Sequence, residues 1–420
     1  MHNRIMVAPM CVYSANNGHL TPFHLVHLGG FAMRGAGLTI VEATGVQARG
    51  RLSPGCPGLW QDSQVEPLKQ VVDFVHAQGH KIGIQLAHGG RKASTHPPWV
   101  AEANVGRGQA MVAHNDEGGW EGDVWGPSTL PYGPGCVDKV HQMTIPEIEQ
   151  TVRDFASAAK RAVKAGVDII EIHAAHGYLL CSFLSPLSNV RDDHYGGKPF
   201  ENRTRMLFDV IKAIRSVIPD TMPLFLRISA TEWVEGGWDV EDSIKLAKML
   251  PEHGVDLLDV SSGGNMPQQK IVMNNGFQVG IAGRMRKELR AAGIDLPIGA
   301  VGFITQAEPA AQIVERGAKT DDAPVAAEPT KKVEADHEGT NGVDGVMLKK
   351  EPLTFETESG ATTQADVILV ARQFLREPEW VLRVAHQLGV DVNWPHQYAR
   401  AKWSNKLTLG AEVRKEGSKI

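Results

Sequence analysis

Two histidines and a tyrosine stand close together in the segment EIHAAHGYLLCSFLSP, residues 171 to 186. His173 and His176 come where an apolar, β-branched run ends, and Tyr178 follows two residues later. Imidazole N–H groups can polarise a carbonyl oxygen. A phenol, with an ordinary pKa of about 10, stays protonated at neutral pH and can act as a general acid. The three side chains are therefore candidates for catalysis and for binding a carbonyl-containing substrate.

Simpler interpretations of the same residues were weighed. The His-x-x-His spacing also suits a metal pair, but zinc needs a third ligand and the sequence offers no obvious carboxylate partner beside the two histidines. We therefore predict no metal site. A single histidine at a strand end often has a packing role, but this explains the combination of two imidazoles and a phenol less well.

The elements that must position these residues alternate along the chain. Short apolar, β-branched runs are separated by longer amphipathic segments, and no dinucleotide-type G-x-G-x-x-G follows any strand. This alternation predicts an α/β fold of the closed (β/α)₈ TIM-barrel class. The predicted strands are 4–10, 38–46, 81–88, 167–175, 223–229, 255–263, 297–302 and 366–372, and the predicted helices are 62–79, 144–166, 201–218, 240–254, 283–293, 306–317 and 377–389.

Catalytic groups in such a barrel come from the C-terminal ends of several strands. With no carboxylate cluster among them, the strand-end residues suit an electron-rich planar cofactor and a polarised carbonyl better than metal hydrolysis. Taken singly, each could also be structural: a thiol in the core, an arginine in an ion pair, an amide that tethers a loop. Besides the histidines and the tyrosine, these residues are Ala8, Pro9, Met10, Cys11, Tyr13, Ala43, Gln85, His88, Arg227, Gly302, Ala371 and Arg372.

The ends of the last two predicted strands indicate a phosphate group. Backbone N–H groups after strands seven and eight form the usual phosphate site of this barrel, and Gly302 stands there. Arg372 can neutralise the phosphate through two parallel hydrogen bonds. We therefore expect a phosphorylated cofactor.

Two segments interrupt the alternation of strands and helices. Residues 89–143 are rich in Gly, Pro, His and Trp and follow the third strand, which predicts a capping region or lid over the site. Residues 318–365 are charged and rich in Ala and Pro, which predicts a surface insertion before the eighth strand, with a weak strand pair inside it. We treat residues 1–420 as one barrel domain that ends in a tail over 401–420.

Charge and cysteine content narrow the classes of partner. The chain carries 43 basic and 48 acidic residues, for a formal net charge of -5, so nothing favours nucleic acid binding. The four cysteines lie far apart, without a C-x-x-C pair, which argues against an iron–sulfur cluster and a disulfide framework. No run approaches the roughly 20 apolar residues of a membrane span. We predict a cytoplasmic protein with no membrane partner.

At these residues the sequence resembles the Old Yellow Enzyme family of FMN-dependent ene-reductases, in its thermophilic-like class of bacterial and fungal NADPH dehydrogenases. The resemblance extends over nearly the whole chain, through long motifs in the same order. The motifs are NRIMVAPMCVYSANNGHLTPFH, GIQLAHGGRKAS, EIHAAHGYLLCSFLSPLSNVRDDHYGG, ENRTR, GAVGFIT, ARQFLREPEW and the final QYAR at 397–400.

The resemblance implies a flavin site at the barrel mouth. FMN would lie against Ala8, Pro9, Met10 and Cys11, with Ala43, Gln85 and Arg227 at its ring. Gly302, Ala371 and Arg372 would hold its phosphate. Ala371 stands where many relatives have glycine, a change of one methyl group that we expect the site to tolerate.

The resemblance also assigns the reaction. NADPH or NADH would supply hydride through flavin N5 to the β-carbon of an α,β-unsaturated carbonyl compound. His173 and His176 would hold the carbonyl oxygen, and Tyr178 would protonate the α-carbon. Tyr13 would contact the substrate, and Arg400 would reach into the site of a neighbouring subunit, so we expect a homo-oligomer, either a dimer or a tetramer.

Other functions on the same scaffold were considered. A flavin-binding barrel with lost or specialised turnover remains the alternative, although such a protein would be expected to lose Tyr178 or the histidine pair. The iron–sulfur reductases of the wider family need a four-cysteine motif, which is missing. An aldolase or isomerase would need a Schiff-base lysine or a catalytic carboxylate at a strand end. Relatives also carry a further segment before strand one that caps the barrel floor, so we expect the underside of the barrel to be less covered here.

Overall fold

A closed barrel of eight parallel strands forms the centre of the structure, a computed structural model that describes residues 1–105, 111–271, 274, 276–315 and 363–403. Each barrel strand lies within the range predicted from the sequence, shortened by up to four residues in total. The barrel strands are β1 (Ile5–Val7), β2 (Leu38–Gly45), β3 (Ile82–Ala87), β6 (Ile169–Ala174), β7 (Leu224–Ser229), β8 (Leu257–Ser261), β9 (Ile298–Val301) and β10 (Val367–Val370).

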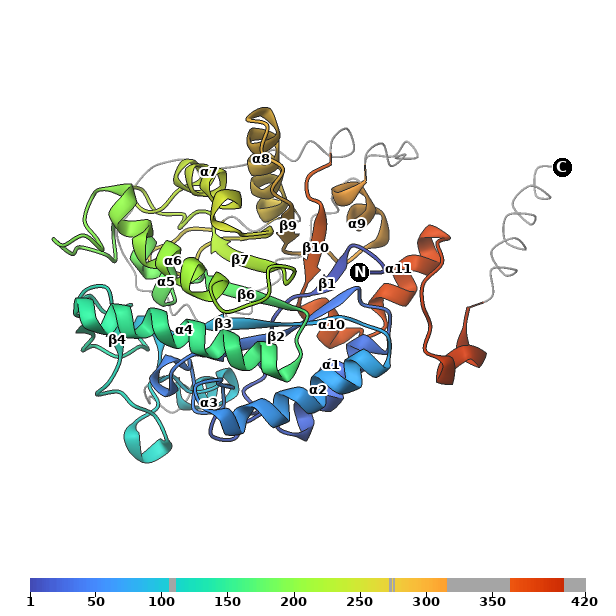
Figure 1. The fold of residues 1–420 in the computed structure, drawn as a ribbon, viewed down its shortest axis with the longest axis horizontal. Coiled ribbons are helices and arrows are strands. Elements are labelled where there is room, and N and C mark those ends of the chain that lie inside the picture. Colours follow the sequence, from blue (N-terminus) through green and yellow to red (C-terminus); the bar gives the residue numbers. More distant parts are fainter. Residues whose placement is uncertain (106–110, 272–273, 275, 316–362, 404–420) are drawn as a thin grey trace.

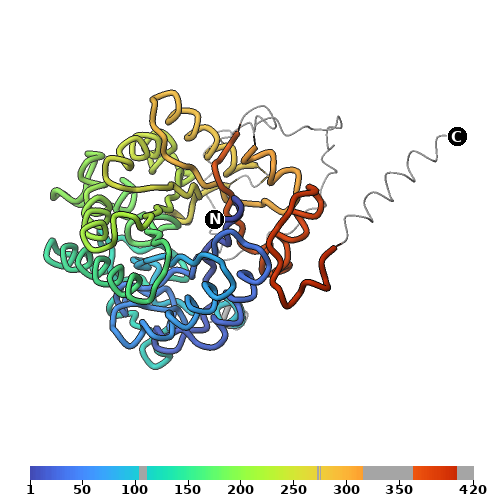
Figure 2. The backbone as a smooth tube through the Cα atoms, turned by 45° about the vertical axis from the view of Figure 1, so that its right-hand side comes forward, coloured from blue at the N-terminus to red at the C-terminus, as the bar shows by residue number. Residues whose placement is uncertain are grey.

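The chain runs once around the barrel. Strands pair in the order β1-β10-β9-β8-β7-β6-β3-β2, and β1 closes the ring by pairing with both β2 and β10. Figure 2 shows this circuit in the order of the colours, from blue through green and yellow to red. Every C-terminal strand end therefore opens on the same side of the barrel, which confirms the predicted (β/α)₈ class.

Helices surround the strands on the outside (Figure 1). Their ends lie close to the predicted ones, with two exceptions. Helix α8 begins at Phe277, six residues before the predicted start at residue 283, and α7 is followed by a separate short turn. The helices between or after the barrel strands are α1 (Pro22–Ala32), α2 (Val65–Ala77), α4 (Ile145–Ala165), α5 (Leu179–Leu184), α6 (Phe200–Arg215), α7 (Val240–Met249), α8 (Phe277–Ala291), α9 (Ala307–Val314), α10 (Arg372–Arg376) and α11 (Trp380–Leu388), with 3₁₀ turns η1 (Ala48–Gly50), η2 (Asp62–Gln64), η5 (Pro251–His253) and η6 (His396–Ala401).

Three of the helices around the barrel lie where the sequence predicts none. Helix α1 was missed because PFHLVHLGGFA lacks a clear polar face and carries two adjacent glycines, which lower helix propensity. Packing explains one of them, since a Cβ on Gly29 would lie 2.6 Å from the ring of Phe74 on α2. Helix α5 is apolar and completely buried, so it shows no amphipathic period. The last strand was expected to reach residue 372, but it ends at Val370 and α10 begins instead.

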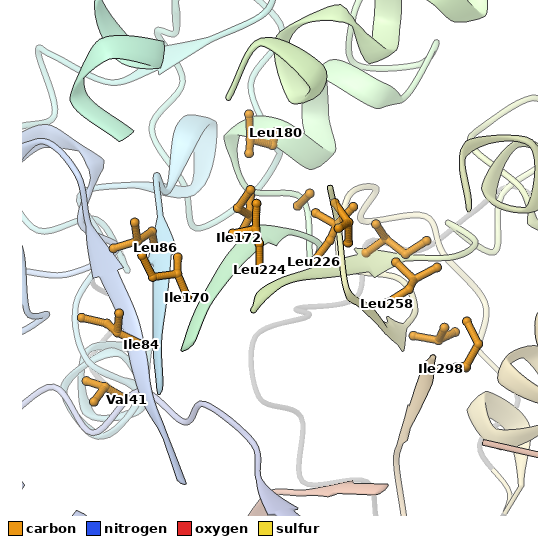
Figure 3. Packing of buried hydrophobic residues seen from close by; sticks show 14 of the residues in the cluster. Val41, Ile84, Leu86, Ile170, Ile172, Leu180, Leu224, Leu226, Leu258 and Ile298 are labelled. Atoms are coloured by element: carbon orange, nitrogen blue, oxygen red, sulfur yellow. The ribbon is translucent and has the colours of Figure 1, made fainter. Parts of the chain in front are cut away.

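Apolar side chains fill both sides of the sheet. Residues that point outward, such as Ile84, Ile172 and Leu226, pack beneath the helices, as Figure 3 shows around β2, β3 and β6 to β9. Residues that point inward, such as Leu38, Phe225 and Leu369, fill the lower part of the barrel. Because each fully buried side chain of this size contributes roughly 1.5–3 kcal/mol, this double layer holds the strand ends firmly in place.

The region between β3 and α4 forms a separate structure beside the barrel. It contains η3 (Gly90–Lys92), α3 (Pro98–Val105), η4 (Asn115–Glu117) and a two-stranded pair, β4 (Trp125–Gly126) with β5 (His141–Gln142). A small apolar cluster that includes Ala93, Val124 and Val140 holds it together. Nearly all of the predicted surface insertion (318–365) and most of the predicted tail (401–420) lie outside the described residues.

Candidate functional site

The inside of the barrel changes from apolar to polar toward the C-terminal strand ends. Because successive side chains of a strand alternate between its two faces, Glu171 and His173 of β6 both point inward. The register places His173 beside Arg227 of β7, and Arg227 beside Asp259 of β8. These polar side chains form a layer above the apolar interior and below the barrel mouth.

Arg227 is the centre of this polar layer. Its Nε forms a short ion pair with Asp259 and lies 3.9 Å from a Glu171 oxygen. Burial alone would lower the pKa of Arg227, but the Asp259 and Glu171 carboxylates outweigh it and raise that pKa. In the same layer, Gln85 Nε2 donates a hydrogen bond to Glu171 Oε1 at 2.7 Å.

The buried carboxylates correct one sequence-based expectation. We expected no carboxylate cluster among the strand-end residues, yet Glu171 and Asp259 lie within the barrel with their side chains completely buried. Burial raises the pKa of Glu171 to about 8. The alternation in EIHA, which puts Glu171 on the face of His173, was the available signal. Glu42 of β2, also buried, accepts the backbone N–H of Val12 at 3.0 Å.

His173, His176 and Tyr178 come together directly above this layer. The ring of His173 lies edge-on to both neighbours, with centroid distances of 5.1 Å to His176 and 4.9 Å to Tyr178. His173 is the second-last residue of β6, and Tyr178 caps the start of α5. The predicted trio is therefore one compact cluster at the barrel mouth.

Both imidazoles are held in the neutral form. Burial is the main cause that lowers the pKa of His173, and burial lowers that of His176 to about 3; the cation of Arg227 adds to both shifts. The Nδ1 atom of His173 accepts the backbone N–H of Ala175 at 3.2 Å, so the proton of the neutral ring is on Nε2. His173 therefore presents an N–H donor on the side away from its own backbone.

Two serines orient His176. Ser261 Oγ at the end of β8 lies 2.8 Å from His176 Nε2, and Ser229 Oγ at the end of β7 accepts the backbone N–H of His176 at 2.8 Å. Ser229 in turn donates to the carbonyl of Gly263 at 2.7 Å. When the Ser261 hydroxyl donates to Nε2, the neutral His176 ring carries its proton on Nδ1. The sequence analysis named neither serine, although both lie on the inward face of their strands.

The backbone after β6 makes an unusual turn. His176 and Gly177 both have positive φ, 62° and 75°. A Cβ on Gly177 would lie 2.3 Å from the carbonyl oxygen of Gly264, in the loop after β8. Glycine is therefore required at 177, and the turn that separates the histidines from Tyr178 is packed directly against a neighbouring loop.

The predicted residues after β1 lie at the same mouth. Ala8 is buried, and Pro9, Met10 and Cys11 are partly exposed. A hydrogen bond with the Cys56 thiol, followed by burial, raises the pKa of Cys11. Tyr13 has a positive φ of 50° and its ring packs edge-on against Trp99 of α3, at 5.7 Å. The lid region thus contacts one of the predicted substrate-binding residues.

A glycine and a short helix mark the other side of the mouth. Gly302 has a φ of 114°, and a Cβ there would lie 2.9 Å from Gln278 Nε2. Gln278 of α8 also bridges the Ser262 hydroxyl and the carbonyl of Val301, although neither Gln278 nor Ser262 was named from the sequence. Ala371 caps the start of α10, where Arg372 is the first helical residue.

Arg400 is the one predicted site residue that the fold does not bring to the mouth. It lies in η6, where the Tyr398 ring stacks on the Arg34 guanidinium at 6.0 Å. Arg34 follows the C-terminus of α1, at the opposite end of the barrel. Arg400 is exposed there.

Two kinds of feature are absent from the described residues. In that part of the chain, no three or more His, Cys, Asp and Glu side chains are arranged to hold a metal ion. Nor does it contain a helix that combines the length and the apolar character needed to cross a membrane.

Comparisons with known proteins identify the family of the chain. The model of the NADH:flavin oxidoreductase / NADH oxidase family, the FMN-dependent oxidoreductases, matches residues 1–320. The chain belongs to this family. It is 46% identical over 327 residues to an NADH:flavin oxidoreductase from Gibberella zeae, covering 75% of this chain and 76% of that one. It is 37% identical over 401 residues to an NADPH dehydrogenase from Bacillus velezensis, covering 95% of each.

Solved structures of this family share the fold. Morphinone reductase superposes with a TM-score of 0.63 at 23% identity, covering 93% of this chain and 87% of that chain. The same enzyme in complex with tetrahydroNAD gives a TM-score of 0.62 at 23% identity, covering 94% and 88%. The family match and the two relatives named above show that this chain is an oxidoreductase of the Old Yellow Enzyme type that uses FMN and a reduced nicotinamide.

The residues at the mouth fit FMN. The Nη2 atom of Arg227 is buried and has no hydrogen-bond partner among the described residues, so an N–H donor of this side chain is left unused. An unpaired buried donor is costly unless a ligand accepts from it, and the oxygen-rich edge of an isoalloxazine supplies such an acceptor. Gly302 carries no side chain and follows β9, whose partner strand β10 leads into α10, so backbone N–H groups at these two strand ends are candidates to hold the phosphate.

Proposed function

We propose that this protein is an ene-reductase, which uses reduced nicotinamide to saturate the double bond of α,β-unsaturated carbonyl compounds. The observation that carries the proposal is the contact of a neutral His173 with both His176 and Tyr178 above the buried Arg227. This arrangement pairs neutral hydrogen-bond donors with an acid. A flavin-binding barrel without turnover would have no need for that pairing.

FMN would be held by the residues named at the mouth. Gln85 and Arg227 would contact the ring, Ala8, Pro9, Met10, Cys11 and Ala43 would line it, and Gly302, Ala371 and Arg372 would hold the phosphate. When bound, FMN supplies a two-electron carrier that accepts hydride from a reduced nicotinamide and delivers it to an activated double bond. The cation of Arg227 favours the electron-rich state of such a ring.

The two histidines would bind the carbonyl oxygen of the substrate. The Nε2–H of His173 is available for this bond, and the Nδ1–H of His176 is the matching donor when Ser261 donates to Nε2. Because both rings are neutral, they polarise the carbonyl by hydrogen bonding without transferring a proton to it. The β-carbon of the substrate is thereby made electron-poor and able to accept hydride.

Tyr178 would complete the reaction by donating its hydroxyl proton to the α-carbon. Burial raises the pKa of Tyr178, so the phenol is fully protonated at neutral pH and ready to act as a general acid. Tyr13 would contact the same substrate from the lid side.

Arg400 belongs to a further part of the proposal. The fold places it at the end of the barrel opposite its own mouth, so it would act in the site of a neighbouring copy. This would make the protein a homo-oligomer, either a dimer or a tetramer.

The test separates the two half-reactions. Purified protein loaded with FMN should be bleached anaerobically by NADPH or NADH and reoxidised by 2-cyclohexenone. Tyr178→Phe should leave bleaching within about twofold and slow reoxidation by roughly 10²–10⁴-fold, the range of general acid catalysis. Equal slowing of both half-reactions would contradict the proton-donor role, and FMN-loaded wild type that no nicotinamide bleaches would contradict the whole proposal.

A further inference from the structure

Lys92 places its ammonium group beside the proposed acid. It is the last residue of η3, directly after β3, and its Nζ lies 5.5 Å from the centroid of the Tyr178 ring and 4.4 Å from that of Tyr132 in the lid. Nζ donates to the backbone carbonyls of His176, at 3.1 Å, and Gly264, at 3.0 Å. The sequence analysis assigned this lysine no role.

This cation has no carboxylate to balance it. Among the described residues, no Asp or Glu oxygen lies within ion-pair distance of Lys92. The charged or titratable groups around it are Arg91, the thiols of Cys136 and Cys181, the neutral His173 and His176, and the two tyrosines. Burial consequently lowers the pKa of Lys92. Holding a charge in such a place costs free energy that a neutral donor to the two carbonyls would avoid.

The Tyr178 phenol beside Lys92 offers a reason for this cost in free energy. When a phenol loses its proton, the negative charge spreads over the oxygen and the ring, and a cation near the ring face is attracted more strongly than before. A cation that is fixed in advance by two carbonyls needs no rearrangement when that charge develops. We propose that Lys92 is a positioning residue that stabilises the Tyr178 phenolate as the phenol protonates the substrate.

The proton count is simple. The Tyr178 O–H bond breaks, its proton forms the new C–H bond at the α-carbon, and the electron pair remains on Oη. Lys92 keeps its three protons throughout, and water restores the phenol before the next turnover. This inference rests on the proposed function, because it requires Tyr178 to be the proton donor.

A double-mutant cycle tests the inference. Lys92→Met keeps the length of the side chain and removes the charge, and Lys160→Met on the exposed face of α4 is the matched control. Reoxidation of the reduced holoenzyme by 2-cyclohexenone should slow about tenfold in Lys92→Met, because a unit charge 5–6 Å away contributes strongly at the effective dielectric of a protein site. The solvent deuterium isotope effect on this step should rise, since proton transfer becomes slower.

The decisive comparison is made in the Tyr178→Phe background. There Lys92→Met should have less than a twofold further effect, because no phenolate forms. A tenfold loss of the reoxidation rate in both backgrounds, or an unchanged isotope effect, would show that Lys92 has only a structural role and would overturn the inference. FMN content and melting temperature identify any variant that fails to fold, and Lys92→Arg, which keeps a cation, should then recover part of the rate.

If Tyr178→Phe itself has no effect on reoxidation, the proposed function fails instead. The two failures are therefore distinguishable.

Discussion

Arg227 and Asp259 form an ion pair inside the barrel, between directly paired positions of β7 and β8. Asp259 is completely buried, and the same Arg227 Nε lies 3.9 Å from a Glu171 oxygen. The ion pair with Asp259 thus holds the guanidinium while its Nη2 is left without a hydrogen-bond partner among the described residues. The pair fixes the cation that we assign to the flavin ring, so structure and cofactor binding depend on the same contact.

Removal of Asp259 should therefore affect both stability and FMN binding. In Asp259→Asn, a buried cation loses its main partner, which typically costs about 3 kcal/mol or more. Chemical denaturation of the FMN-free protein should show this loss, and FMN titration should show weaker binding. Asp192→Asn, at an exposed position, is the control and should change neither. A loss below about 1 kcal/mol would mean that Glu171 replaces Asp259 as the partner.

Buried neutral histidine should make the protein sensitive to acid. Burial lowers the pKa of His88 from 6.5 to about 3. Below pH 6.5 the unfolded chain takes up a proton that the folded chain refuses, so stability falls as the pH falls through this window. For this one group the free energy of unfolding should drop by about 2 kcal/mol between pH 7 and pH 5.

The measurement is denaturant unfolding at both pH values, in wild type and in His88→Gln. In the variant, the backbone N–H of Gly90 loses its acceptor, the Nδ1 atom of His88. The variant is therefore expected to be less stable than the wild type at both pH values. Its change in stability between the two pH values should nevertheless be smaller than that of the wild type by the stated amount. His396→Gln, at an exposed position of η6, should leave the pH dependence unchanged.

Much of the barrel is readable from the sequence because its strands are buried on both faces. Runs such as KIGIQLAH and VDIIEIHAA are apolar and β-branched throughout, and the structure places β3 and β6 inside them. Helix α4 is equally clear, with Thr144 before it, Pro146 in its first turn and Gly166 after it. Helices α1 and α5 could not be predicted, because neither has the polar face on which the period of 3.6 depends. Helix α1 exposes the apolar Phe23 and Val26, and α5 is completely buried.

The candidate site also has a part that can be predicted from the sequence and a part that cannot. His173, His176 and Tyr178 are close in sequence, so their grouping follows from a short segment. The polar layer beneath them depends on the register of neighbouring strands, which pairs Gln85 with Glu171 and Arg227 with Asp259. Lys92 reaches the site only through tertiary contacts with residues 84 and 172 positions away. No local pattern reports such contacts.

The turn after His176 allows a test with an internal control. Gly177 and Gly236 have nearly the same φ, 75° and 76°, but a Cβ at 177 would lie 2.3 Å from the Gly264 carbonyl oxygen, whereas a Cβ at 236 meets nothing within 4 Å. Gly236→Ala should cost only the conformational strain, about 1 kcal/mol.

Gly177→Ala should cost that strain and also displace the backbone between His176 and Tyr178. We expect a total loss of about 2–4 kcal/mol, together with slower reoxidation of the reduced holoenzyme by 2-cyclohexenone, whereas Gly236→Ala should retain full activity. Thermal melting and single-turnover kinetics measure the two effects. Equal stability losses at both positions would show that the loop after β8 yields to the added methyl group, and that the tight contact between Gly177 and Gly264 is not what positions the acid.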